Sequence, residues 1–180
     1  MQILVTYATK YGATQGIAER IADTLKAEGL DVDVEPVADV KDLARYDAFV
    51  IGSAAYIGSW LKEAKYFVEH NLDILAAKPV WLFSSGPIGT ATVDKKGRDV
   101  LVTSEPKEFA EFATTLKPRD QRVFFGALDS KKLRGVYKLF SLAPASERTL
   151  IEGDFRDWDL IDEWARSVAH ELTASPATAR

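Results

Sequence analysis

Cysteine is absent from this chain of 180 residues, and histidine occurs only twice. Without cysteine the protein can form no disulfide, no thiolate metal site and no cysteine nucleophile, which favours a reducing compartment. His70 and His170 are far apart in the sequence and lie in no metal-ligand pattern, so we expect packing or surface roles for both and no metal site. The Gly-x-Ser-x-Gly motif of serine hydrolases is also missing.

Long apolar runs are missing as well, since no stretch reaches the length needed to span a bilayer. The first residues, Met1 to Thr6, resemble a strand and lack the basic start of a signal peptide, so we expect a cytoplasmic protein. A net charge of −4 argues against general binding of nucleic acid. The length and the apolar fraction of 47% suit one compact domain.

The chain does contain a regular alternation of strand-like and helical segments. Apolar runs typical of buried strands occur at residues 3–7, 32–34, 48–51, 80–83 and 123–125. Apolar residues at helical spacing cover residues 17–25, 60–75, 104–116 and 161–172, and Gly29 is expected to end the first helix. The alternation predicts one α/β domain over residues 1–172, with a parallel sheet between two helical layers. A flexible tail is expected at residues 173–180.

The most informative motif is Thr9-Lys10-Tyr11-Gly12-Ala13-Thr14, which follows the first strand and opens the first helix. Backbone N–H groups at a helix N-terminus, together with hydroxyl donors, can bind a phosphate monoester, and Gly12 permits close approach of the backbone. The motif has neither the Gly-Lys-Ser/Thr of a P-loop nor the three glycines of a dinucleotide fingerprint. Taken alone, it also fits an ordinary strand-to-helix turn with a threonine cap.

Two further loops rich in small residues support the binding interpretation. Residues 52–60 follow the third strand and residues 84–89 follow the fourth. In an open α/β sheet, ligands bind outside the carboxyl ends of the strands where the strand order reverses. The three loops therefore predict one continuous cleft, in which Tyr56 and Trp60 can cover a flat ring.

The first loop resembles the phosphate-binding signature of flavodoxins. The matching residues are Tyr7, Thr9, Gly12, Thr14, Ala18 and Ile21. Thr6 departs from the signature, which usually has a bulky apolar residue there, and this concerns strand packing only. The resemblance covers residues 1 to about 172 and implies a flavodoxin-like fold, a five-stranded parallel sheet in the order 2-1-3-4-5, and FMN as the cofactor.

One branch of this family is especially similar. The segments that resemble menaquinone-dependent protoporphyrinogen oxidases are Val50-Ile51-Gly52, Tyr56-Ile57-Gly58, Phe125-Gly126-Ala127-Leu128, the basic insert that follows them, and Asp157-Trp158. By this resemblance FMN would contact Thr9, Lys10, Tyr11, Gly12, Ala13, Thr14, Ala54, Ala55, Tyr56, Ile57, Gly58, Ser84, Ser85, Gly86, Pro87, Ile88 and Gly89. FMN would itself perform the electron transfer, so no catalytic side chain is assigned.

An insert after strand five, at residues 129–150, is too long for a plain strand-to-helix connection. Residues 117–148 hold eight basic and three acidic residues, a net +5, whereas the rest of the chain carries −9. Within the insert, Lys131, Lys132, Arg134 and Lys138 accompany apolar residues at helical spacing. A basic amphipathic segment of this kind can contact an anionic membrane, or it can be a lid packed on the edge of the sheet.

Three functions remain open from the sequence. The first is an oxidoreductase of the protoporphyrinogen oxidase type, which passes electrons through FMN to a quinone. The second is an electron carrier that serves redox partner proteins, although the basic insert is unusual for a carrier. The third is a binding module without redox chemistry.

Overall fold

The computed structural model describes residues 1–129 and 152–174. Five parallel strands form the central sheet: β1 (Gln2–Ala8), β2 (Asp31–Pro36), β3 (Ala48–Tyr56), β5 (Val80–Ser85) and β6 (Asp120–Phe124). Their order is β2-β1-β3-β5-β6, which confirms the predicted order 2-1-3-4-5 of the main strands. The short β4 (Ser59–Trp60) pairs with β3 in the antiparallel direction. A separate antiparallel pair consists of β7 (Ala127–Leu128) and β8 (Gly153–Asp154).

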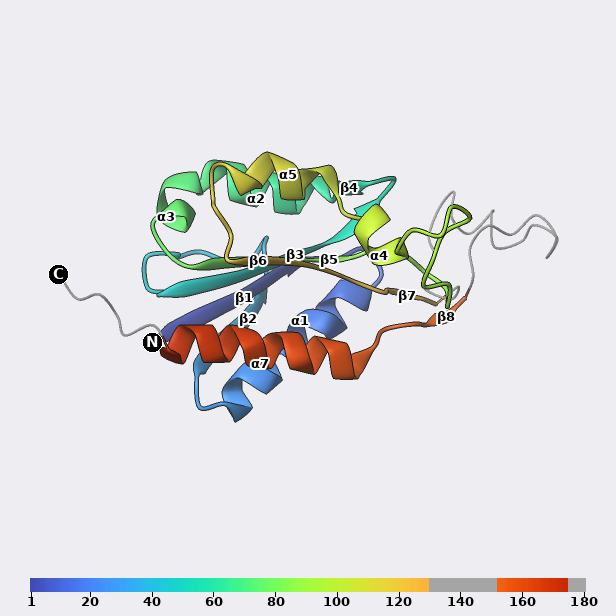
Figure 1. Ribbon diagram of the computed structural model, residues 1–180. Helices are drawn as coiled ribbons and strands as arrows, with labels where there is room; N and C mark the ends of the chain where they lie inside the picture. The colour runs from blue at the N-terminus through green and yellow to red at the C-terminus, as the bar shows by residue number, and fades with distance from the viewer. Residues whose placement is uncertain (130–151, 175–180) are drawn as a thin grey trace.

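Helices cover both faces of the sheet, as Figure 1 shows. On one face lie α1 (Ala13–Ala27) and α7 (Trp158–Ala174), and on the other lie α2 (Lys62–His70), α3 (Leu72–Ala76) and α5 (Lys107–Ala113). A short α4 (Val100–Thr103) precedes α5. Successive residues of β1 point to opposite cores, with Ile3 and Val5 in the α1/α7 core and Leu4 in the α2/α5 core. Burial of both faces explains why the inner strands β1, β3 and β5 are largely apolar, whereas the edge strands β2 and β6 contain charged residues.

Gly29 ends α1 as the sequence predicts. It has a φ of 85°, in the left-handed region, and its N–H donates to the carbonyl of Lys26 at 2.9 Å. The side chain of Asp99 caps α4 by accepting from the N–H groups of Leu101 and Val102. A glycine and a capping aspartate are local signals, so they act in the fold as they do in isolated helices.

Three predicted helix boundaries differ in the structure. The helix expected over residues 60–75 begins at Lys62 and is broken at Asn71, while Trp60 belongs to β4. The helix expected from Ser104 begins at Lys107, because Ser104 is the C-cap of α4 and Pro106 is the N-cap of α5. The last helix continues beyond residue 172 to Ala174, into the segment predicted as a tail.

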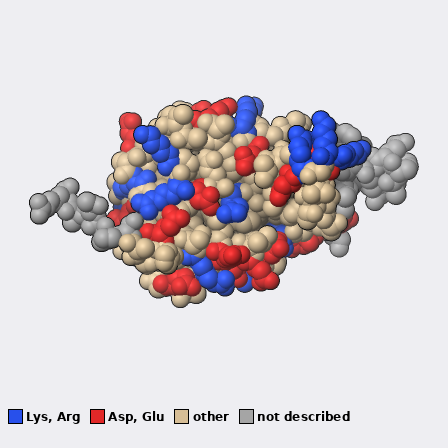
Figure 2. Space-filling view, viewed as in Figure 1, with Lys and Arg blue, Asp and Glu red and all other residues tan. Residues whose placement is uncertain are grey.

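The basic insert falls almost wholly in residues 130–151, so the predictions on Lys131, Lys132, Arg134 and Lys138 lie outside the described residues. On the face seen in Figure 2, acidic and basic side chains are interspersed, and neither sign covers it. In residues 1–129 and 152–174, no helix combines the length and the apolar character that crossing a bilayer requires.

Candidate functional site

A cleft lies at the carboxyl ends of the parallel strands, where the three predicted loops meet. Residues from four separate segments line it: Thr9, Tyr11, Ala13, Thr14, Ala54, Ala55, Tyr56, Ile57, Ser85, Gly86, Ile88, Gly126, Ala127 and Leu128. The strand order reverses between β1 and β3, and this is the point where ligands bind in open α/β sheets. The sheet topology therefore brings the loops after β1, β3 and β5 into one site.

The N-terminus of α1 forms one end of this cleft. Gly12 is the N-cap residue with a φ of 91°, and no side chain caps the helix. The N–H of Gly12 donates to Oγ1 of Thr9 at 3.0 Å, which closes the loop on itself. The N–H groups of the first helical turn have no partner within the helix, so an uncapped N-terminus beside a cleft can bind an anion.

A buried pair of hydroxyl groups joins the start of α1 to the end of β5. Oγ1 of Thr14 and Oγ of Ser85 are 2.8 Å apart, and the two residues are 0% and 5% exposed. Both residues line the cleft. The pair fixes the distance between two loops that are 71 positions apart in the sequence.

The opposite wall of the cleft contains a tight turn between β3 and β4. Tyr56 pairs with Ser59, and the two residues between them have positive φ angles, 53° for Ile57 and 70° for Gly58. Two consecutive left-handed residues are typical of the type I′ hairpin turn. A β-branched residue in this region is strained, and the side chain of Ile57 is fully exposed at the rim of the cleft.

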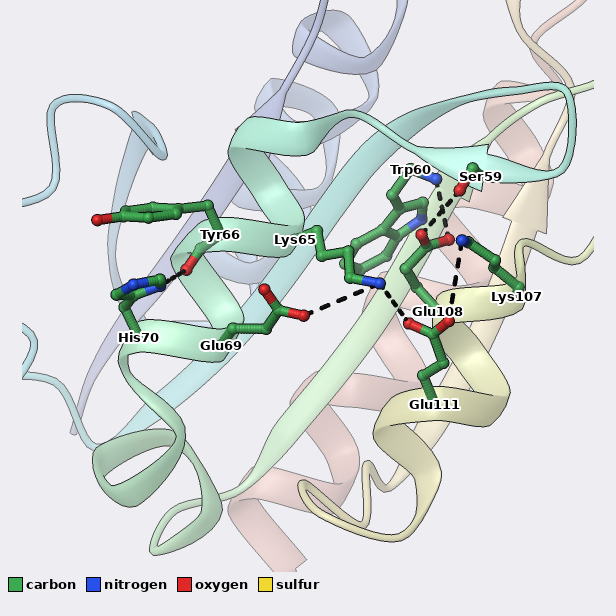
Figure 3. A network of polar contacts seen from close by, with 9 residues as sticks. All are labelled: Ser59, Trp60, Lys65, Tyr66, Glu69, His70, Lys107, Glu108 and Glu111. Carbon is green, nitrogen blue, oxygen red and sulfur yellow. Dashed lines mark hydrogen bonds and ion pairs between the residues drawn. The ribbon is translucent and has the colours of Figure 1, made fainter.

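Helix α5 holds this turn in place, as Figure 3 shows. The carboxylate of Glu108 is fully buried and accepts from Oγ of Ser59 and from the N–H of Trp60, both at 2.9 Å. The N–H of Lys107 donates to the carbonyl of Gly58 at 3.0 Å. A buried carboxylate is costly without such donors, so these contacts fix the geometry of the turn.

The same view shows the surface side of this network. Lys65 lies between Glu111 at 2.8 Å and Glu69 at 3.8 Å, on exposed surface where ion pairs contribute little. His70 stacks on Tyr66 with ring centroids 3.6 Å apart, and its Nδ1 contacts the carbonyl of Tyr66. The packing and surface role expected for His70 agrees with this position.

A lysine lies at the edge of the cleft. Nζ of Lys10 is 5.7 Å from the ring centroid of Tyr11 and 5.8 Å from that of Tyr56, and both rings line the cleft. An ammonium group over aromatic faces is attracted by their quadrupoles. The two walls of the cleft are thus connected by one cation.

Some predicted contact residues do not line the cleft, namely Lys10, Gly12, Gly58, Ser84, Pro87 and Gly89. The hydroxyl of Ser84 is fully buried and bonds to the carbonyl of Ser53, so it takes part in the sheet. The sequence named Tyr56 and Trp60 as residues able to cover a flat ring, and of the two only Tyr56 lines the cleft. The side chain of Trp60 is 4% exposed and packs against Phe109 and Phe112, and the N–H of Trp60 donates to Glu108 of α5.

The prediction also omitted part of the wall. Gly126, Ala127 and Leu128 line the cleft directly after β6. The rule that ligands bind at the carboxyl ends of the strands applies to the segment after β6 too, so the sequence held a signal for these residues. Ala127 and Leu128 form β7, which pairs with β8, a strand that comes after residues 130–151 in the sequence.

Comparison with known proteins is consistent with this geometry. The family model described as the Flavodoxin domain matches residues 4–140. The chain is 25% identical over 183 residues to protoporphyrinogen IX dehydrogenase (quinone) of Escherichia coli K12, covering 98% of each chain. It is 23% identical over 175 residues to NAD(P)H dehydrogenase (quinone) of Nitrobacter winogradskyi, covering 85% of this chain and 84% of the relative.

Solved flavodoxin structures share the fold. A flavodoxin from the domain Archaea has a TM-score of 0.58 at 17% identity, covering 96% of this chain and 99% of its own. A flavodoxin of Streptococcus pneumonia TIGR4 has a TM-score of 0.57 at 19% identity, with 97% and 99% covered. At these identities the likeness concerns the fold alone.

Proposed function

Because this chain belongs to the flavodoxin domain family, we propose that it binds FMN in the cleft and acts as an oxidoreductase that delivers electrons to a quinone. The observation that supports this best is the uncapped N-terminus of α1 at the end of the cleft, with Gly12 in the left-handed region. That arrangement suits a single phosphate monoester at the end of a larger ligand. It also favours FMN over FAD, because the described residues include no second nucleotide-binding loop.

The residues present fit such a group. At the phosphate end, the N–H groups of the α1 first turn and the hydroxyl of Thr14 are available as donors beside the cleft. At the ring end, Ala54, Ala55 and Gly86 leave space between the loops, and Tyr56 offers an aromatic face. Small residues on two walls admit a flat ring, and the aromatic side chain can stack on it.

Bound FMN would supply the electron-transfer chemistry. This chain's own residues would bind the phosphate, orient the ring and limit access of water. Glu108 and Lys107 would hold the β3–β4 turn against one side of the ring, because they fix Ser59, Trp60 and Gly58. No side chain of the cleft is required as an acid or a base.

The electron acceptor is argued from the relatives. Two relatives that align over most of their length have quinone in their names, and they differ in the electron donor that the names state. We therefore infer a quinone acceptor, with protoporphyrinogen IX as the first candidate donor and a reduced nicotinamide dinucleotide as the second. A plain electron carrier between proteins is less favoured, because neither of these relatives is named as one.

The test uses the purified protein under anaerobic conditions. Flavin released by denaturation is identified by mass, and FAD or no flavin would reject the cofactor assignment. The reduced protein is then mixed with a menaquinone analogue, and fast reoxidation is expected. Protoporphyrinogen IX and NADPH are compared as reductants of the oxidised protein. Reduction by neither, together with slow reoxidation by the quinone, would favour the carrier function.

A peripheral contact with an anionic membrane is a further part of the proposal. It would bring the protein to a lipid-soluble quinone at the membrane surface. Its support is the composition of the segment that contains Lys131, Lys132, Arg134 and Lys138, since each basic residue near an anionic surface contributes roughly 1 kcal/mol. The alternative is a lid on the edge of the sheet, and the liposome experiment in the Discussion separates the two.

A further inference from the structure

Arg156 lies beside the phosphate end of the cleft, although it is 143 positions from Ala13 in the sequence. Its Nη1 donates to the carbonyl of Ala13 at 3.3 Å. Ala13 is the first residue of α1 and also lines the cleft. A side chain from the C-terminal part of the chain therefore contacts the helix turn that would bind the phosphate.

The guanidinium group is fixed on two other sides. Its Nε and Nη2 donate to the two carboxylate oxygens of Asp154 at 2.8 and 2.5 Å, a bidentate pair. Its Cζ lies 4.4 Å from the ring centroid of Trp158, as in a cation–π contact. The hydrogen bond from Arg156 holds the pKa of Asp154 below its ordinary value. The Arg156 side chain is only 16% exposed, so these contacts form a rigid support for Nη1.

Gly16 explains how the guanidinium reaches the helix. A Cβ atom placed on Gly16 would lie 2.4 Å from Nη1 of Arg156, which is too close for any real contact. Gly16 is the fourth residue of α1, inside the helix, where glycine is unfavourable relative to alanine. Gly16 has no positive φ angle that would call for glycine. The space that it leaves is occupied by Arg156.

We propose that Arg156 is a positioning residue for the phosphate site, and that Gly16 is the gap in α1 that admits it. The proposal rests on the proposed function, since it assumes that the phosphate of FMN binds at this helix. By fixing Ala13 from outside, Arg156 holds the first-turn N–H groups in the orientation that binds the phosphate. It therefore sets the preference of the protein for FMN over riboflavin, which has the same ring and no phosphate.

The experiment titrates FMN and riboflavin separately into apo-protein and follows the quenching of flavin fluorescence. The variants are Arg156→Met, Gly16→Ala, and the two combined. Each single change should weaken FMN binding by about three- to tenfold, which lies in the lower part of the range for coupling between neighbouring residues, and leave riboflavin binding unchanged. The double variant should be no weaker than Arg156→Met alone, because both changes remove the same contact.

Arg20→Met is the matched control. Arg20 is a residue of α1 itself and pairs with the carboxylate of Asp162 on α7 at 2.6 Å, outside the cleft. The Arg20→Met variant should bind FMN with unchanged affinity. Gly16→Ala guards against a folding defect, since alanine favours the helix and the far end of Arg156 can move away.

Three results would overturn the proposal: unchanged FMN affinity in Arg156→Met and Gly16→Ala, equal weakening of FMN and riboflavin, or an equal loss in Arg20→Met. A different result would reject the proposed function itself. If the wild-type protein binds FMN no better than riboflavin, then no phosphate site exists at α1. The role of Arg156 is thus tested by the variants, whereas the phosphate site itself is tested by the wild-type protein.

Discussion

The hydroxyl oxygens of Thr14 and Ser85 lie 2.8 Å apart in a buried position that joins the first turn of α1 to the end of β5. A threonine hydroxyl has one proton to donate and two lone pairs to accept with. Thr14 can therefore donate to an anion in the cleft while it accepts from Ser85. The pair connects the first turn of α1 to the carboxyl end of β5 at the cleft.

Replacement of Thr14 by alanine should weaken FMN binding. Loss of one hydrogen bond to a charged group costs about 1.5–3 kcal/mol, which corresponds to a rise in Kd of roughly ten- to hundredfold. Fluorescence titration of the apo-protein measures the change. Thr103→Ala is the control, because the hydroxyl of Thr103 bonds only to backbone carbonyls on the exposed α4. An equal Kd for both variants would contradict the role of Thr14.

Gly12→Ala should reduce both stability and FMN affinity, whereas Gly29→Ala should reduce stability alone. Both glycines have left-handed φ angles, 91° and 85°. A Cβ atom in this region costs roughly 1–2 kcal/mol. Only Gly12 caps the helix beside the cleft, whereas Gly29 follows the other end of α1. Thermal unfolding and FMN titration of the two variants separate the effects, and a loss of affinity in Gly29→Ala would count against the loop assignment.

Thr6→Val should stabilise the protein. Thr6 is fully buried in β1, and none of the described residues offers a hydrogen-bond partner to its Oγ1. Exchange of an unpaired buried hydroxyl for a methyl group should raise the stability by up to about 1 kcal/mol, or the melting temperature by roughly 2–4 °C. Thr14→Val is the matched control, since its buried hydroxyl is paired. It should lower the melting temperature, and a fall in Thr6→Val would refute the reasoning.

Asp162→Asn should destabilise the protein at neutral pH and less so in acid. The pKa of Asp162 is lowered, first by the hydrogen bond from Arg20, and also by Thr24. A carboxyl with a lowered folded pKa stabilises the fold above its unfolded pKa of about 3.9, and this is lost as the pH falls through the folded value. The difference in unfolding free energy between wild type and variant should therefore be full near neutral pH and shrink below about pH 4. A difference that is constant with pH would mean that the charge of Asp162 has no role.

Exchange of Lys131, Lys132, Arg134 and Lys138 for glutamine should reduce sedimentation with anionic liposomes at low salt, and binding to neutral liposomes should not change. The reason is the loss of four positive charges near a negative surface, an attraction that salt screens within about 10 Å. FMN affinity should be unaltered. If wild-type protein does not sediment with anionic liposomes, the segment is better explained as a lid.

Some residues of the candidate site could be predicted from the sequence and others could not. It could be predicted that Thr14 and small residues after β3 and β5 line one cleft, because ligand sites in open α/β sheets lie at the carboxyl ends of the strands. The position of Trp60 could not be predicted, since apolar spacing places it equally well in a helix. Its place in β4 follows from the contact of its N–H with Glu108, which is 48 positions away. Likewise, no local pattern connects Arg156 to Ala13.

The sequence by itself determined the layered α/β fold, because apolar periodicity fixes which segments are strands and helices and their alternation requires a parallel sheet between helical layers. The strand order came from the resemblance of the first loop to flavodoxins. The sequence also determined the loop that opens α1, since a glycine cap and flanking hydroxyl residues act over a few positions. The tertiary structure alone decided which side chains meet in the cleft. Such contacts join residues tens of positions apart, as with Thr14 and Ser85, and depend on how the helices pack on the sheet. Packing of this kind is set by the complementary shapes of many side chains together, and no single segment contains that information.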